Sequence, residues 1–273
     1  MSLDPLRFTG SRFGVEHPRP RVSVCMATYN GAAYVLEQVD SILAQLASDD
    51  ELVIVDDASA DDTVALIEAL DDPRVHLTRA TVNAGYVRSF ESALSRATGD
   101  VLLLADQDDV WIPGRLDVLL SALAESGASI VASNLVVLGT DEPLPSPLTG
   151  RPWRLERAQS SQHRRNVLRI MLGDAPYFGC AMGLRRGALD LVTPFPRFLT
   201  ESHDLWLAIA GNEARSIVHV EEPTLYRRVH ESNASTPRPR GIRAALASRW
   251  MLVRARSEAR RRLRRLRRLR GSR

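Results

Sequence analysis

The sequence predicts an α/β fold in which a mostly parallel sheet is flanked by helices and followed by a basic helical tail. Three observations support this prediction. Short apolar runs alternate with segments of helical spacing in the first half of the chain, polar clusters follow three of those runs, and arginine dominates the C-terminal end. Alternating strands and helices are typical of parallel sheets.

The first half supplies the regular part of the predicted sheet. Its apolar runs are too short for helices and rich in β-forming residues, as in buried strands. Strand–helix–strand units at this spacing form right-handed crossovers. The predicted strands are 22–26, 52–55, 75–78 and 101–105, and the predicted helices are 33–46, 61–70 and 86–96.

The second half is less regular, although the same patterns recur. A segment rich in proline and glycine at 139–150 reads as a surface loop. The predicted helices are 113–125, 164–172 and 204–210, and the predicted strands lie within 128–138 and at 179–184 and 216–220.

The charge distribution divides the chain into a body and a tail. All 36 basic residues are arginine, and 15 of them lie from Arg238 onward with a single acid, Glu258, so this segment carries +14. The other 21 arginines and 32 acids give the preceding part −11. We therefore expect an N-terminal lead-in at 1–20, a catalytic domain at 21–237 and a tail at 238–273 that meets an anionic partner.

Cysteine usage and hydropathy suggest a cytoplasmic protein. Cys25 and Cys180 each lie in an apolar context, which favours two buried thiols over a disulfide. No signal peptide and no uncharged run long enough to span a membrane is evident.

The strongest chemical signal is the tetrapeptide Asp106-Gln107-Asp108-Asp109, which directly follows the apolar run 101–105. Ligands bind beyond the carboxyl ends of the strands in such sheets. Three carboxylates on one turn repel one another, and a cation would relieve that repulsion. Hard oxygen ligands suit Mn²⁺ or Mg²⁺, which keep positions open for diphosphate oxygens. The alternative is a solvated helix cap.

Four ordered motifs carry a family resemblance that covers roughly residues 20–235. The chain resembles glycosyltransferase family 2, including its bacterial rhamnosyltransferase-like members of surface polysaccharide assembly. Each motif alone is weak, but their order and spacing are specific. The motifs are Val24-Cys25-Met26-Ala27-Thr28-Tyr29-Asn30-Gly31, Val55-Asp56-Asp57-Ala58-Ser59, Asn83-Ala84-Gly85 and Asp106-Gln107-Asp108-Asp109-Val110-Trp111.

The resemblance implies a GT-A (Rossmann-like) fold, a nucleotide-diphosphate-sugar donor, a divalent metal and inversion at the anomeric carbon. Ala27, Thr28 and Tyr29 would then line the donor site, with Ala27 and Tyr29 against the base. Asp57 would accept the base N–H, which UDP and dTDP share. The remaining roles fall on the acidic turn, where Asp106 would contact the ribose and Asp108 the metal. Asp109 would be a structural carboxylate, with a share in the metal as the alternative.

The third motif opens a predicted helix. Gly85 permits close backbone approach, and a helix N-terminus favours phosphate or carbonyl oxygens. Arg88 lies one turn into this helix, within reach of a nucleotide. For Asn83 and Gly85 a purely structural turn is the alternative.

The resemblance also supplies a catalytic base. An inverting transfer needs a group that deprotonates the attacking hydroxyl. Asp204 opens an apolar helix, and similar enzymes place their base before such a helix. A helix cap is the alternative, and Glu201 and His203 are the rival bases.

The segment 226–233 contains His230, which lies where related enzymes place an additional metal ligand. Arg227 and Arg228 could neutralise diphosphate charge as the bond to the sugar breaks.

The tail shows Leu263, Leu266 and Leu269 at three-residue spacing between arginines. An amphipathic, arginine-rich helix over residues 241–270 suits an anionic membrane surface, and thus a peripheral position on the inner face of the cell membrane. A disordered solvated tail and a nucleic-acid-binding tail are the alternatives, and no recognition motif supports the latter.

The sequence thus predicts a metal-dependent inverting glycosyltransferase that acts on a lipid-linked or growing cell-surface glycan. A nucleotidyltransferase is disfavoured, because the chain has no lysine for a catalytic glycine-rich loop. A catalytically weak nucleotide-sugar-binding or membrane-recruiting protein on the same fold is the other alternative. The retained carboxylates argue against it.

Overall fold

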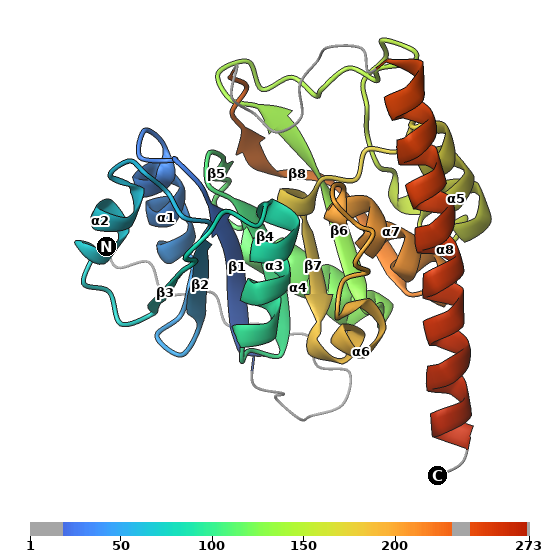
Figure 1. Cartoon of the computed structure of the whole chain (residues 1–273), viewed down its shortest axis with the longest axis horizontal. Coiled ribbons are helices and arrows are strands. Elements are labelled where there is room, and N and C mark those ends of the chain that lie inside the picture. Colours follow the sequence, from blue (N-terminus) through green and yellow to red (C-terminus); the bar gives the residue numbers. More distant parts are fainter. Residues whose placement is uncertain (1–18, 231–240, 272–273) are drawn as a thin grey trace, which may run out of the picture.

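A computed structural model describes residues 19–230 and 241–271 of the chain. One twisted sheet is covered by helices on both faces (Figure 1). Most of the predicted lead-in, and residues 231–233 of the last motif, lie outside the described residues. The α/β fold with flanking helices and a C-terminal helix is confirmed.

The sheet has eight strands in the order β3-β2-β1-β4-β7-β6-β8-β5. The first four strands in this order, β3, β2, β1 and β4, are mutually parallel, and β6 is parallel to β8. Strands β7 and β5 are antiparallel to their neighbours. The strands are β1 (Val22–Thr28), β2 (Glu51–Asp56), β3 (Val75–Arg79), β4 (Val101–Asp106), β5 (Val110–Trp111), β6 (Ile130–Val137), β7 (Met182–Arg185) and β8 (Ile217–Arg227).

Two hydrophobic cores lie on opposite faces of this sheet. Alternate residues of a strand point to opposite faces, so Cys25 belongs to one core and Val24 to the other. One core packs on α1, α2 and α4, and the other on α3 and the C-terminal helices. The helices are α1 (Val35–Leu43), α2 (Thr63–Glu68), α3 (Tyr86–Arg96), α4 (Arg115–Ser126), α5 (His163–Leu172), α6 (Leu189–Val192), α7 (His203–Ala214) and α8 (Ile242–Gly271).

The second half departs from the sequence prediction in two strands. The predicted strand at 179–184 begins as a 3₁₀ turn, Gly179–Ala181, and becomes extended only at Met182. The predicted strand at 216–220 continues to Arg227. This continuation is hard to predict from the sequence because it contains Glu221, Glu222 and Pro223. A register shift beside Asn134 of β6 accommodates them, and the Asn134 amide donates to the Glu221 carbonyl at 2.8 Å.

The C-terminal helix packs along the body, mainly against α7 (Figure 1). Met251, Leu252, Ala255 and Ala259 are buried in this contact. The predicted free apolar stripe of the tail is therefore wrong for two of its three leucines, because Leu263 and Leu266 pack against the core. Leu269 is exposed.

Both cysteines are buried free thiols, as predicted. Among the described residues, no helix has the length and hydropathy needed to cross a membrane.

Candidate donor and catalytic site

The polar motifs converge where β1, β2 and β4 end, beside the end of β8. Parallel register sets β1 Ala27 beside Asp106 of β4 and Thr28 beside Asp56 of β2. The antiparallel pairing of β5 with β8 sets Val110 opposite Tyr226, so β8 ends beside the acidic turn. This topology brings the segment that follows Tyr226 next to the acidic turn at 106–109, although the two are far apart in the sequence.

The first motif presents backbone and one aromatic ring at this edge. The Thr28 hydroxyl is buried and donates to Asp56 at 2.9 Å, whereas the Tyr29 side chain is 47% exposed. The Gln107 carboxamide bridges the Tyr29 backbone, accepting from its N–H at 2.8 Å and donating to its carbonyl at 3.0 Å. A Cβ at Gly31 would overlap this carboxamide, so glycine here leaves room for Gln107 to bridge Tyr29.

Asp57 joins the second and third motifs. Its carboxylate is 2% exposed and accepts the backbone N–H groups of Ala84 and Gly85, each at 2.8 Å. The Asn83 side chain accepts the Gly85 N–H at 3.2 Å. Gly85 has a φ of 85°, which favours glycine. A carboxylate at the N-terminus of α3 is stabilised by the helix dipole and by these amides.

Arg88 is engaged by the protein itself. Its guanidinium contacts Glu91 at 2.6 Å and donates to the carbonyls of Pro196 and Leu199 at 2.9 and 3.0 Å. These bonds tie α3 to the segment that precedes α7. A nucleotide contact of Arg88 would compete with these bonds, and it stays a prediction.

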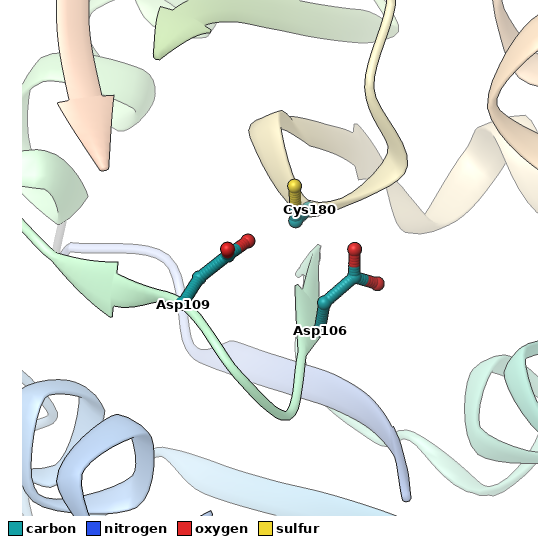
Figure 2. Close-up of side chains that lie close together, drawn as sticks. All are labelled: Asp106, Asp109 and Cys180. Atoms are coloured by element: carbon teal, nitrogen blue, oxygen red, sulfur yellow. The ribbon is translucent and has the colours of Figure 1, made fainter. Parts of the chain in front are cut away.

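The Cys180 thiol lies close to two carboxylates of the acidic turn. Ligand atoms of Asp106, Asp109 and Cys180 lie within 4.8 Å of one another (Figure 2). Burial and then the neighbouring carboxylates raise the pKa of Asp106 and of Asp109. One Asp109 oxygen, Oδ2, is buried without a hydrogen-bond partner among the described residues. Burial also raises the pKa of Cys180, which keeps the thiol protonated beside the two acids.

Asp108 and His230 are brought together, although 122 positions separate them in the chain. The His230 Nε2 lies 2.8 Å from Asp108 Oδ2, and both side chains are largely buried. Carboxylate oxygen and imidazole nitrogen are both common metal ligands. The residues present therefore fit a divalent cation at this point.

The segment that carries His230 docks on two elements. Arg228 donates from Nε to the Asp108 carbonyl at 3.1 Å and pairs with Glu37 of α1. The Tyr34 ring stacks on His230 with centroids 4.8 Å apart, and the Arg228 guanidinium lies 5.0 Å from the same ring. The N-terminus of α1 thus forms one wall of the site.

Asp204 lies in the first turn of α7. Its Oδ1 accepts the Leu205 N–H at 2.7 Å, and burial raises the pKa of the carboxyl to about 6. Arg227 lowers the pKa of Asp204, Asp106 and Asp109 alike, so one guanidinium stands near all three carboxylates.

The rival base His203 is unsuited to accept a proton from a substrate. Its ring is 5% exposed and stacks on Phe90 at 4.3 Å between centroids. Burial lowers the pKa of His203 to about 3. Tyr86 lies edge-on to the same ring, and its hydroxyl accepts the Ser202 N–H at 3.0 Å. Glu201, the other rival, is partly exposed.

The contacts of three further site residues were not predicted from the sequence. Gln107 clamps Tyr29, Tyr34 holds His230, and Cys180 faces two acids. Each contact joins residues more than 60 positions apart, so no local pattern announces it. The only local signal was the position of Gln107 inside the acidic tetrapeptide.

Comparison with known proteins is consistent with this geometry. Succinoglycan biosynthesis protein ExoO of Rhizobium meliloti is 36% identical over 122 residues, 45% of this chain and 35% of ExoO. The Escherichia coli UDP-Glc:alpha-D-GlcNAc-diphosphoundecaprenol beta-1,3-glucosyltransferase WfgD is 24% identical over 202 residues, 72% of this chain and 73% of WfgD.

Solved structures share the fold. Residues 1–349 of S. aureus TarS, in complex with UDP-GlcNAc, superimpose with a TM-score of 0.61 at 20% identity. The match covers 78% of this chain and 60% of that one, so TarS extends beyond the shared fold. The family model for Glycosyl transferase family 2 matches residues 23–192, more than half of the sequence. The chain belongs to glycosyltransferase family 2.

Proposed function

We propose that this protein is a metal-dependent, inverting glycosyltransferase that moves a sugar from a UDP- or dTDP-linked donor to a hydroxyl of a lipid-linked or growing cell-surface glycan. The observation that carries the proposal is the 2.8 Å approach of His230 to Asp108, next to the acidic end of β4. Relatives named for succinoglycan biosynthesis and for glucosyl transfer to a diphosphoundecaprenol-linked sugar support the acceptor class.

The donor nucleotide would lie along the ends of β1, β2 and β4. Tyr29 offers an exposed ring to the base, and Ala27 lies beside Asp106 on the adjoining strand. Asp57 is held by two backbone amides and keeps lone pairs for the base N–H. Asp106 is partly exposed at the strand end, where it would accept from a ribose hydroxyl.

Asp108 and His230 would hold Mn²⁺ or Mg²⁺, which when bound supplies positive charge to the diphosphate leaving group. Arg228 lies against the same turn and would stabilise the diphosphate as the bond to the sugar breaks. Asp204 would accept the acceptor hydroxyl proton while that oxygen forms its bond to the anomeric carbon. The bond from that carbon to the diphosphate oxygen breaks on the opposite side, which inverts the configuration.

The proposal places the enzyme at the cytoplasmic face of a membrane, where lipid-linked acceptors are found. The arginine-rich helix α8 supports attachment to an anionic membrane surface through residues 241–270.

A thermal-shift screen of nucleotide sugars with and without Mn²⁺ or Mg²⁺ tests the proposal. We expect one UDP- or dTDP-sugar to raise the melting temperature in the presence of the cation, and a chelator to remove the effect. Stabilisation that is equal in chelator would contradict the metal role. Stabilisation by no pyrimidine nucleotide would contradict the donor class. Radiolabelled transfer to a lipid-linked acceptor then tests catalysis.

A further inference from the structure

The outward face of α8 carries exposed apolar side chains upstream of the leucine stripe. Leu246 and Trp250 are each 65% exposed, and Val253 is 44% exposed. Their spacing of four and then three residues sets them on one side of a helix. The residues of the same helix that face the body are Met251, Leu252, Ala255 and Ala259, all buried.

The same outward side becomes basic further along the helix. Eighteen residues correspond to five helical turns, so Arg264 lies on the side of Leu246 and Arg268 on the side of Trp250. Both arginines are exposed, as are Arg265 and Arg267. The acids Glu213 and Glu258 pair with Arg256, Arg260, Arg261 and Arg262. No acid in residues 19–230 or 241–271 pairs with Arg264, Arg265, Arg267 or Arg268.

We propose that this outward face of α8, with Leu246, Trp250 and Val253 inserted and Arg264 and Arg268 on the headgroups, is the surface that docks on an anionic lipid bilayer. The inference rests on the membrane association of the proposed function and replaces its predicted contact, since Leu263 and Leu266 face the core. Tryptophan and leucine enter the boundary between headgroups and acyl chains, and arginine pairs with anionic lipid there.

The charge pattern favours lipid over a second copy of the chain. A parallel two-fold contact through this face would bring the exposed arginines of two helices together, and an antiparallel contact would set them against the apolar Leu246 and Trp250 of the other helix. A bilayer instead supplies anionic headgroups along the whole helix. The helix begins at the end of the molecule where β8 ends and runs down its flank, with its last turns beyond the body (Figure 1).

Trp250 allows bilayer contact of the outward face of α8 to be followed by tryptophan fluorescence. Trp111 and Trp206 are 2% and 0% exposed and Trp153 is partly exposed, so Trp250 is the most exposed of the four tryptophans. With vesicles of phosphatidylglycerol and phosphatidylcholine, we expect a blue shift of tryptophan emission and co-flotation of the full-length protein. Trp250→Phe should still bind but lose the blue shift.

Two paired sets of variants test the contact by co-flotation. Trp250→Ser and the double variant Leu246→Ser/Val253→Ser should each weaken binding about tenfold, whereas Leu148→Ser, at a 62% exposed leucine outside α8, should not. Arg264→Gln/Arg268→Gln should weaken binding about 25-fold at low salt, at about fivefold per arginine. Exposed arginines elsewhere serve as its control, in Arg96→Gln/Arg157→Gln.

Several results would overturn the inference. They are equal binding to vesicles of phosphatidylcholine alone, binding that survives the serine variants, or a Trp250-dependent dimer in sedimentation without vesicle binding. Retention on a soluble polyanion that matches vesicle binding and ignores Trp250 would point to nucleic acid instead. Partitioning requires no sugar transfer, so donor-induced thermal shifts of the same variants separate this inference from the proposed function.

Discussion

The two halves of the site hold their functional side chains in different ways. At the ends of β1 and β2, Asp57 accepts two backbone amides and the Tyr29 backbone is bridged by Gln107. In the C-terminal half, the Asp204 carboxylate accepts one adjacent amide, and burial raises its pKa to about 6. Groups fixed by several bonds suit recognition of a nucleotide, whereas a carboxyl with a raised pKa suits proton transfer.

The largest expected effect falls where the two halves meet. Asp108→Ala removes the carboxylate that lies 2.8 Å from His230, so the proposed cation would lose a ligand and the segment after β8 would lose its contact with the acidic turn. We expect metal-dependent donor hydrolysis or transfer to fall by about a thousandfold or more. Asp117→Ala, at an exposed acid of α4, is the matched control. Full activity of Asp108→Ala would remove this residue from the metal site.

Asp204→Asn should separate binding from chemistry. An amide cannot accept the acceptor proton, so transfer should fall by about a hundredfold to ten-thousandfold, as for loss of a general base. Donor affinity, measured by isothermal titration with Mn²⁺, should be unchanged, because the proposed donor contacts are at the ends of β1, β2 and β4. Normal turnover would reassign the base to Glu201.

The same variant should be more stable than the parent at high pH. The pKa of Asp204 is raised from 3.8 to about 6 by burial, so the ionised carboxylate destabilises the fold above pH 6. Asp204→Asn should therefore gain roughly 1–3 kcal/mol in the free energy of unfolding at pH 8. The gain should disappear between pH 6 and pH 4, as the parent protonates. Denaturant unfolding at both pH values measures it, and a constant difference would contradict the shifted pKa.

The contrast between the two halves of the site also explains which of their features could be predicted from the sequence. Asp57, Asp106 and Asp108 follow apolar runs, and in a parallel sheet the strand ends meet at one edge, so their grouping was predictable from the chain alone. Two carbonyl partners of Arg88, those of Pro196 and Leu199, lie more than 100 positions away, so the sequence does not show that the guanidinium is held by the protein. Leu263 and Leu266 showed an apolar stripe, but the sequence does not say whether such a stripe meets lipid or the protein core.

An intermediate effect is expected at the better-fixed half. Both oxygens of Asp57 accept backbone N–H groups, so Asp57→Asn sets an amide NH₂ against one of those donors. The mismatch should cost about 1–3 kcal/mol in stability and weaken donor binding. Thermal unfolding and nucleotide titration measure the two effects. Asp62→Asn is the control, since Asp62 precedes α2 without a side-chain capping bond. Equal effects of both variants would contradict the special role of Asp57.

The smallest effect should come from the ring that supports the metal ligand. Tyr34 stacks on His230 and lies beneath the Arg228 guanidinium, but it belongs to neither predicted ligand set. Aromatic stacking and cation–π contacts contribute about 1 kcal/mol each, so Tyr34→Leu should raise the Mn²⁺ concentration for half-maximal activity about fivefold or more.

A comparison of Tyr34→Leu with Tyr34→Phe tests whether the ring of Tyr34 acts by holding His230 in position. Phenylalanine keeps the ring face and should keep the metal response of the parent, while leucine should restore normal kcat only at saturating Mn²⁺. A fall in kcat that excess metal does not reverse would mean that Tyr34 supports the fold of α1 rather than the position of His230. In that case the two halves of the site would meet through Asp108 alone.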